Sequence, residues 1–259
     1  MLGLLSVFLA AHSYPVDGIV VAVDRSARTI LVSHRPIGRY MPAMMMPFRV
    51  ERADDLNPLY AGARVHFELV VNRASSTARH VVKVADGEIA PPKEKIHPGD
   101  AVADFSLRDQ NGREVRLSDL RGKVLAVDFI YTRCPLPDVC PRLSANFASL
   151  QQRFRERLGT DLVLLSITVD PEYDTPPVLA AYARRWSADG RGWLFLTGDV
   201  AGVAAQLGEV YWTDEGAIGH NSMTSIIGRD GRLSAAVDGS NWRAGQLGDL
   251  VAHELEGKK

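Results

Sequence analysis

The sequence predicts two successive domains, a small all-β barrel and then an α/β domain with helices on both faces of a sheet. Three observations lead to this fold class. Short strand-like runs fill residues 18–86 without a helical pattern. After residue 100, apolar strands alternate with helical patterns. Between them, residues 85–100 carry three prolines, two glycines and mixed charge, which is typical of a linker.

The first domain is predicted to hold about five strands. Residues 18–24 and 28–34 form a hairpin pattern around a short turn. In RVHFELVV (64–71), apolar and polar residues alternate, the period of a strand with one buried face. ARHVVKVAD (78–86) follows. A closed barrel of the OB-like kind is expected, because closure removes exposed strand edges.

The second domain begins with a hairpin pattern at 104–117, where Asn111-Gly112 marks the turn. VLAVDFIY (124–131) is apolar apart from Asp128, as expected of a central strand. Further strands are predicted at 162–170 and 193–197, a hairpin at 223–237, and helices from Pro141, at 176–186, at 199–210 with Asp199 as the cap, and at about 242–256.

Composition excludes some functions. The net charge of −1 argues against nucleic-acid binding, which normally needs a basic stripe. No run of 18 apolar residues occurs, so no internal membrane span is expected. LGLLSVFLAA (2–11) has the length of a signal-peptide core, although no Lys or Arg precedes it. We therefore expect a signal peptide at 1–13, export from the cytoplasm, and a chain either released or held at the membrane through its N-terminus.

The two cysteines of the chain, Cys134 and Cys140, lie in TRCPLPDVCP (132–141). Cys134 follows the predicted central strand, and Cys140 precedes a helix whose first position is Pro141. Free N–H groups and the positive dipole end at a helix N-terminus lower a thiol's pKa, and the thiolate is both nucleophile and metal ligand. A redox pair or a soft-metal site is therefore favoured over a stabilising disulfide or two inert thiols.

A strand, a cysteine loop and a helix make the thioredoxin layout, and the second domain resembles the Sco/SenC family of copper-handling proteins with that fold. The resemblance rests on DFSLRDQNGREVRLSDLRGKVLAVDFIYTRC, on DVCP, on VDPEYDTPPVLAAYA (169–183) and on GHNSMTSIIGRDGRL (219–233). It implies a metal site of Cys134, Cys140 and His220. One departure is the loop, which has five residues between the cysteines where the family usually has three.

Methionine is concentrated in SHRPIGRYMPAMMMPF (33–48), where Met41, Met44, Met45 and Met46 follow His34. Methionine usually fills gaps in a core, but four beside a histidine and two prolines favour a second soft-metal site. Residues 17–84 resemble the small periplasmic copper-binding barrel of the CusF type. That resemblance implies His34, Met44 and Met46 as ligands, with Met41 at the place of the family's tryptophan.

Together these features predict a possible signal peptide (1–13), a CusF-like barrel (14–86), a linker (87–99) and a Sco-like thioredoxin-fold domain (100–257). The resemblances imply a periplasmic or otherwise extracytoplasmic copper metallochaperone that carries Cu(I) or Cu(II) to a cuproenzyme such as a cytochrome c oxidase subunit. The alternative is a thiol–disulfide oxidoreductase with Cys134 and Cys140 as catalytic residues, so whether the chain is an enzyme stays open. A peroxiredoxin-like peroxidase ranks last, because no motif of that kind surrounds Cys134.

Overall fold

The structure is a computed structural model that describes residues 12–41, 44–72, 75–85, 95–214, 217–240 and 242–257, with backbone alone at 44–45, 213–214 and 217. The predicted leader, apart from its last two residues, and most of the predicted linker lie outside these ranges. The chain divides into two compact units, Met1–Ala90 and Pro91–Lys259. No helix in the described ranges is long and apolar enough to cross a membrane.

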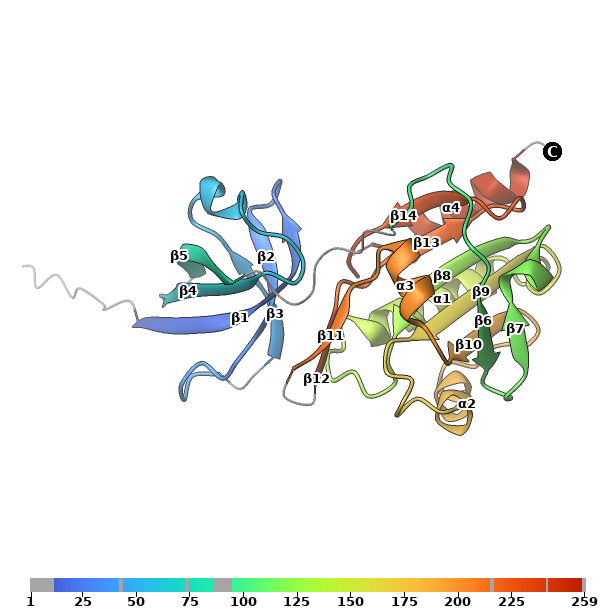
Figure 1. Cartoon of the computed structure of the whole chain (residues 1–259), viewed down its shortest axis with the longest axis horizontal. Helices are drawn as coiled ribbons and strands as arrows, with labels where there is room; N and C mark the ends of the chain where they lie inside the picture. The colour runs from blue at the N-terminus through green and yellow to red at the C-terminus, as the bar shows by residue number, and fades with distance from the viewer. Residues whose placement is uncertain are drawn as a thin grey trace, which may run out of the picture. The chain divides into compact units, whose positions relative to one another are not determined.

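The N-terminal unit is all-β, as predicted (Figure 1). Its five-stranded antiparallel sheet has the order β3-β2-β1-β4-β5. A bridge between Val50, just after β3, and Ala78 of β5 links the two edge strands of the sheet. The finer OB-like resemblance stays a prediction. The elements are β1 (His12–Asp24), β2 (Thr29–His34), β3 (Met44–Arg49), the short 3-10 helix η1 (Ala53–Leu56), β4 (Arg64–Val71) and β5 (Ser76–Ala85).

Strand β1 begins earlier than the sequence pattern indicated. His12 and Ser13, which the predicted leader includes, pair with Val71 and Val70 of β4. The apolar side chains of β4 face a core that includes Phe48, as its alternation predicted.

The C-terminal unit is built on a seven-stranded sheet in the order β14-β13-β8-β9-β10-β6-β7. The three central strands are parallel and the flanking pairs are antiparallel. Its elements are β6 (Ser106–Asp109), β7 (Glu114–Arg116), η2 (Leu117–Leu120), β8 (Val124–Ile130), α1 (Cys140–Arg153), β9 (Leu162–Thr168), α2 (Pro176–Arg185), β10 (Trp193–Thr197), α3 (Ala201–Leu207), β11 (Tyr211–Asp214), β12 (Ala217–His220), β13 (Thr224–Ile227), β14 (Leu233–Val237) and α4 (Ala244–Glu256).

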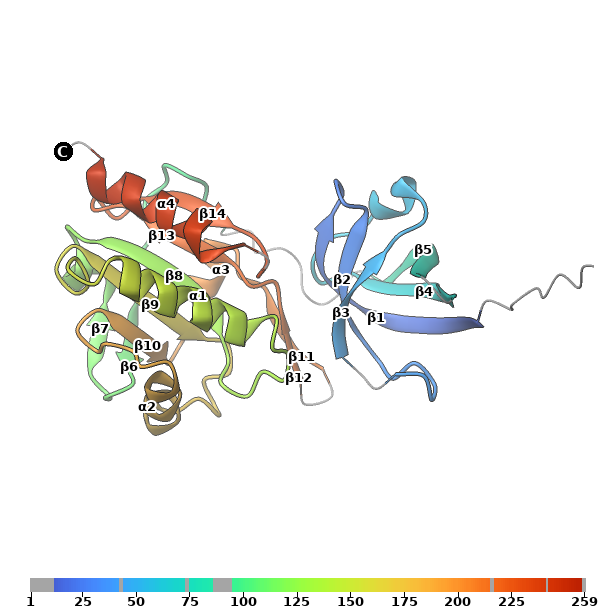
Figure 2. The same ribbon diagram turned by 180° about the vertical axis from the view of Figure 1, so that it is seen from behind.

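Helices cover both faces of this sheet, as predicted. Figure 1 shows α3 in front of the strands, and Figure 2, from behind, shows α1 and α4 in front. α2 packs beside α1, where the hydroxyls of Ser144 and Tyr182 lie 3.0 Å apart. The central strands β8 and β9 are buried along their whole length, which explains their apolar sequences.

One predicted helix start is wrong. Asp199 was expected to cap the helix at 199–210, but α3 begins at Ala201 with Val200 at the N-cap and no side-chain capping bond. The helix then ends at Leu207, because Gly208 adopts the left-handed conformation with φ of 79°.

Candidate functional site

The cysteine loop lies between the end of β8 and the start of α1. Two tight turns shape it, since the N–H of Cys134 bonds to the Tyr131 carbonyl at 3.2 Å and that of Val139 to the Leu136 carbonyl at 3.1 Å. Its far end is anchored, because the Ser240 hydroxyl donates to the Asp138 carbonyl at 2.9 Å. The two additional residues between the cysteines therefore sit in an ordered, tethered loop.

The two thiols are free and differ in environment. Cys134 is partly exposed and Cys140 is fully buried at the first turn of α1. The hydrogen bond with Cys140 is the main cause that lowers the pKa of Cys134 to about 6. Burial, followed by the same hydrogen bond, raises the pKa of Cys140 well above its ordinary value. Cys134 is consequently the thiol that ionises more readily, and the thiolate is the nucleophilic form.

His220, at the end of β12, lies directly against the buried thiol. Its Nε2 is 3.4 Å from the Cys140 Sγ, and its Nδ1 is 2.7 Å from Oε1 of Glu209. The imidazole is fully buried, with the Tyr131 ring packed edge-on against it. Burial lowers the pKa of His220, but the hydrogen bond and charge of Glu209 outweigh it, so the net pKa is raised.

The hairpin that carries His220 closes tightly. Gly219 pairs with Trp212 across β11 and β12, and a Cβ at Gly219 would lie 2.4 Å from the indole ring. Glycine is therefore needed immediately before the histidine.

The predicted ligands Cys134, Cys140 and His220 are thus neighbours, although 80 residues separate the last two in sequence. In the described part of the chain, no three His, Cys, Asp or Glu side chains are already gathered at metal-binding geometry. The three donors consequently close around an ion only with a local rearrangement. Sulfur and imidazole donors suit copper, above all Cu(I).

A network behind the cysteine loop explains the position of the VDPEYDTP segment. The buried Asp174 carboxylate accepts bonds from the Thr132 N–H at 3.0 Å and the Thr168 hydroxyl at 2.5 Å. Arg133 donates from Nε to Asp170 at 2.6 Å. The segment therefore fixes the two residues before Cys134, a role that the sequence pattern did not reveal.

The position of two buried acids beside the site was not predicted from the sequence. Glu209 comes eleven residues before His220 in an unremarkable LGEV stretch, so no local signal identifies it. Asp128 appeared as the polar exception in a central strand. Burial raises the pKa of Asp128 to about 7, with the Glu209 charge adding to it and the Ser166 hydroxyl opposing it.

The N-terminal unit holds a different arrangement around His34. Its Nδ1 donates to the Arg35 carbonyl at 2.7 Å, and its Nε2 is buried with no hydrogen-bond partner among the described residues. Burial lowers the pKa of His34. A buried imidazole nitrogen without a partner is costly unless a ligand uses it.

The predicted methionine ligands lie on the neighbouring strand. The register pairs Met44 with His34 and Met46 with Val32, two positions away on β2. Met46 and Met41 are partly buried against the barrel core, and a bridge between Ile37 and Met41 folds the preceding loop back. The side chain of Met44 lies outside the described residues.

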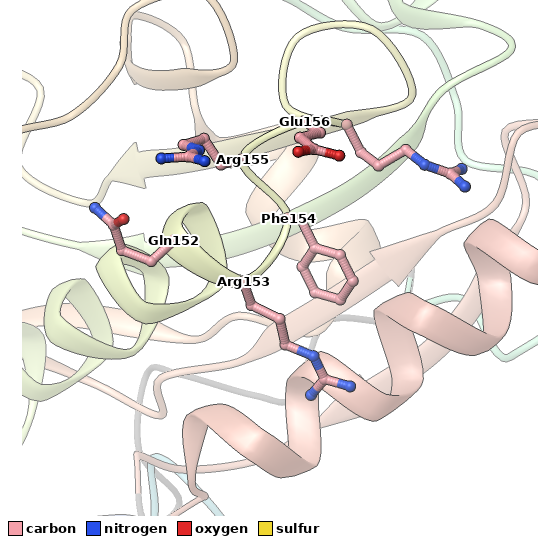
Figure 3. A pocket seen from close by; sticks show the side chains of 6 residues that line it. Gln152, Arg153, Phe154, Arg155 and Glu156 are labelled. Carbon is pink, nitrogen blue, oxygen red and sulfur yellow. The ribbon is translucent and has the colours of Figure 1, made fainter.

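A surface pocket of about 550 Å³ lies at the other end of α1 from Cys140 (Figure 3). Gln152 to Arg157 line it. Arg153 and Arg157 are engaged there in ion pairs with Asp249 and Asp161. It holds none of the predicted site residues, so the chemistry of the chain is not centred there.

Comparisons with known proteins follow the same division of the chain. The SCO1/SenC family model matches residues 93–254, which is more than half of the chain. The model of the copper binding periplasmic protein CusF matches residues 13–83.

Relatives and solved structures match part of the chain. A SCO1 protein homolog of Bacillus subtilis (strain 168) is 35% identical over 97 residues, which are 38% of this chain and 49% of that protein. The structure of BsSco, described as a member of the Sco family of cytochrome c oxidase assembly proteins with a disulfide switch, has a TM-score of 0.54 at 25% identity, covering 65% of this chain and 100% of that chain. Arabidopsis thaliana ScoI with copper bound has a TM-score of 0.53 at 25% identity, covering 61% and 100%.

Proposed function

This chain belongs to the SCO1/SenC family, and from that premise we propose that it is a copper metallochaperone that delivers its ion to a cuproenzyme such as cytochrome c oxidase. The copper is cargo. The observation that carries the proposal is the meeting of Cys140 Sγ and His220 Nε2 at 3.4 Å, beside Cys134. A copper-bound relative and a relative named for cytochrome c oxidase assembly support the choice of metal and recipient.

The barrel contributes a second copper site in this proposal. His34 offers a buried Nε2 that has no hydrogen-bond partner among the described residues, and thioether sulfur from Met44 and Met46 completes a neutral set that suits Cu(I). Met41, at the place of the CusF-type tryptophan, caps the ion. Each site is incomplete enough to exchange its ion, so the barrel can accept copper and pass it to the Cys/His site.

The same comparisons support an expected place of action. The barrel matches a protein named as periplasmic, which supports an extracytoplasmic chain. Membrane attachment through the N-terminus remains a prediction, because the segment concerned lies outside the described residues.

A second candidate function, thiol–disulfide exchange, is favoured by the unlike thiols. The Cys134 thiolate attacks one sulfur of a partner disulfide, and the other partner sulfur leaves as a thiolate. The Cys140 thiol then attacks the Cys134 sulfur of the mixed disulfide, which breaks its bond to the first partner sulfur, and the proton of Cys140 goes to the departing partner thiolate. Two electrons pass to the partner and a Cys134–Cys140 disulfide remains. This step would prepare the cysteines of a partner's copper site, and an insulin-reduction assay measures it directly.

Anaerobic Cu(I) titration of the whole chain tests the main proposal. We expect about two ions per chain, since each donor set suits one Cu(I). His34→Ala should remove one ion and Cys134→Ser with Cys140→Ser the other, while the exposed His66→Ala is the matched control. Binding that survives both removals would refute the proposal.

A further inference from the structure

Glu209 is a buried carboxylate whose two oxygens are both committed. Oε1 lies 2.7 Å from Nδ1 of His220, and Oε2 accepts the backbone N–H of Met223 at 2.6 Å. Its side chain, like that of His220, is fully buried. An ionised carboxylate only accepts hydrogen bonds. The Nδ1 of His220 must therefore carry the proton, and in the neutral ring the lone pair on Nε2 faces the Cys140 sulfur.

Hydrogen bonds from Asn221 to the backbone on either side of Glu209, called the clamp below, hold Glu209 and His220 in place. The side chain of Asn221 bonds twice to the segment with Glu209, accepting from the Val210 N–H at 2.9 Å and donating to the Gly208 carbonyl at 2.9 Å. The Asn221 N–H also bonds to the Val210 carbonyl at 3.1 Å. Because Asn221 directly follows His220, the clamp sets the distance between the carboxylate and the imidazole.

We propose that Glu209 is the positioning residue that makes His220 bind copper through Nε2. The inference rests on the proposed function for the metal, but the choice of nitrogen follows from the hydrogen bonds of the metal-free chain. A carboxylate on the far nitrogen orients the ring and makes Nε2 a stronger donor. Loss of such a partner typically costs about 10- to 100-fold in metal affinity.

Glu209→Gln is the informative substitution because the glutamine amide cannot satisfy both neighbours in the same way. Its single oxygen is needed by the Met223 N–H, which leaves the NH₂ group facing Nδ1 of His220. Nδ1 must then accept, and the proton of the neutral ring moves to Nε2, the nitrogen that copper requires. The variant therefore keeps the size and shape of the side chain at position 209 but changes the neutral His220 ring from the Nδ1–H to the Nε2–H tautomer.

The test uses assigned ¹⁵N NMR of the His220 imidazole in the full chain carrying His34→Ala, so that the buried His34 neither adds a signal nor competes for copper. At a pH where the ring is neutral, we expect the Nδ1–H tautomer of His220 in this background and the Nε2–H tautomer after Glu209→Gln. Cu(I) affinity should fall about 10- to 100-fold in the same variant. Asp238→Asn is the matched control, since Asp238 is an exposed acid whose charge interacts with that of Glu209 but which forms no hydrogen bond to His220 among the described residues.

An Nε2–H tautomer of His220 in the chain with Glu209 intact would overturn the proposal. This measurement does not depend on whether the Glu209→Gln variant folds. Equal Cu(I) affinity with Glu209→Gln would also overturn it. If the chain with Glu209 intact binds no Cu(I), the metallochaperone function fails, whereas the tautomer of the metal-free ring still decides the role of Glu209.

Discussion

The histidines of the two candidate copper sites form similar hydrogen bonds through Nδ1 but lie in different electrostatic environments. In each, Nδ1 donates to an oxygen, and Nε2 is the nitrogen that we propose for copper. The partner of His34 is a neutral carbonyl, and burial lowers its pKa. The partner of His220 is the Glu209 carboxylate, and its pKa is raised. The difference indicates that the side chains around a thioether site can all be neutral, whereas the proposed thiolate site includes the charged carboxylate of Glu209.

The sites also differ in how the chain assembles them. His34 and Met44 are paired in the backbone register of two neighbouring strands, β2 and β3. Cys140 and His220 come from separate parts of the sheet unit and meet only in the folded domain. The barrel site is therefore a local structure, and the Cys/His site depends on the complete tertiary fold.

The largest effect on Cu(I) affinity should come from replacing both thiols, because this change should weaken one site and leave the other unchanged. In Cys134→Ser with Cys140→Ser, hydroxyls replace soft sulfur, and copper at the C-terminal site should weaken by more than the about 100-fold cost of outer-shell changes. The barrel should retain its ion. Isothermal titration with Cu(I) under anaerobic conditions measures both. Parallel weakening of the two sites would break the comparison, because it would mean that they share ligands.

The next largest effect concerns the buried Asp128 carboxyl group of the C-terminal unit. Asp128 keeps its proton in the folded state up to a pKa of about 7, whereas an unfolded aspartate loses it near its ordinary value of 3.8. The folded state binds more protons between those two values, so stability falls as pH rises through that window. At about 1.4 kcal/mol per pKa unit, the loss approaches about 4 kcal/mol.

Asp128→Asn should remove this dependence, because its amide carries no charge at any pH in the window. Urea unfolding of the metal-free chain should show the variant gaining stability relative to the unaltered chain as pH rises from 4 to 8, a range chosen to span the window. A constant difference between the two across that range would contradict the assignment.

The smallest effect is expected at Met41, and measuring it would decide whether Met41 is a ligand of the barrel site. Removing a capping thioether while His34 and two methionines remain should weaken Cu(I) at the barrel by about tenfold, a fraction of what loss of a main ligand costs. Met41→Ala, compared with Met223→Leu in the other unit, tests this by competition with a Cu(I) chelator. No change in affinity would remove Met41 from the ligand set.

The features that the sequence predicted are those with a local pattern. The buried β8, the cysteine at the start of α1 and the alternation in β4 all follow from spacing along one segment. Resemblance to known families supplied His220 and His34, which spacing alone could not identify. Glu209 was missed because its partner lies across a hairpin, and the Asp199 cap was wrong because α3 begins two residues later than the pattern indicated. The network of Asp174 was missed for the same reason, since it joins two loops that only the fold brings together.

Copper K-edge X-ray absorption tests the central claim most directly, on the full chain with His34→Ala and one equivalent of Cu(I). We predict a first shell of two sulfurs and one imidazole nitrogen, with the sulfur contribution lost after Cys134→Ser and Cys140→Ser. A shell of the same composition before and after those substitutions would contradict the account, because the copper would then be bound elsewhere.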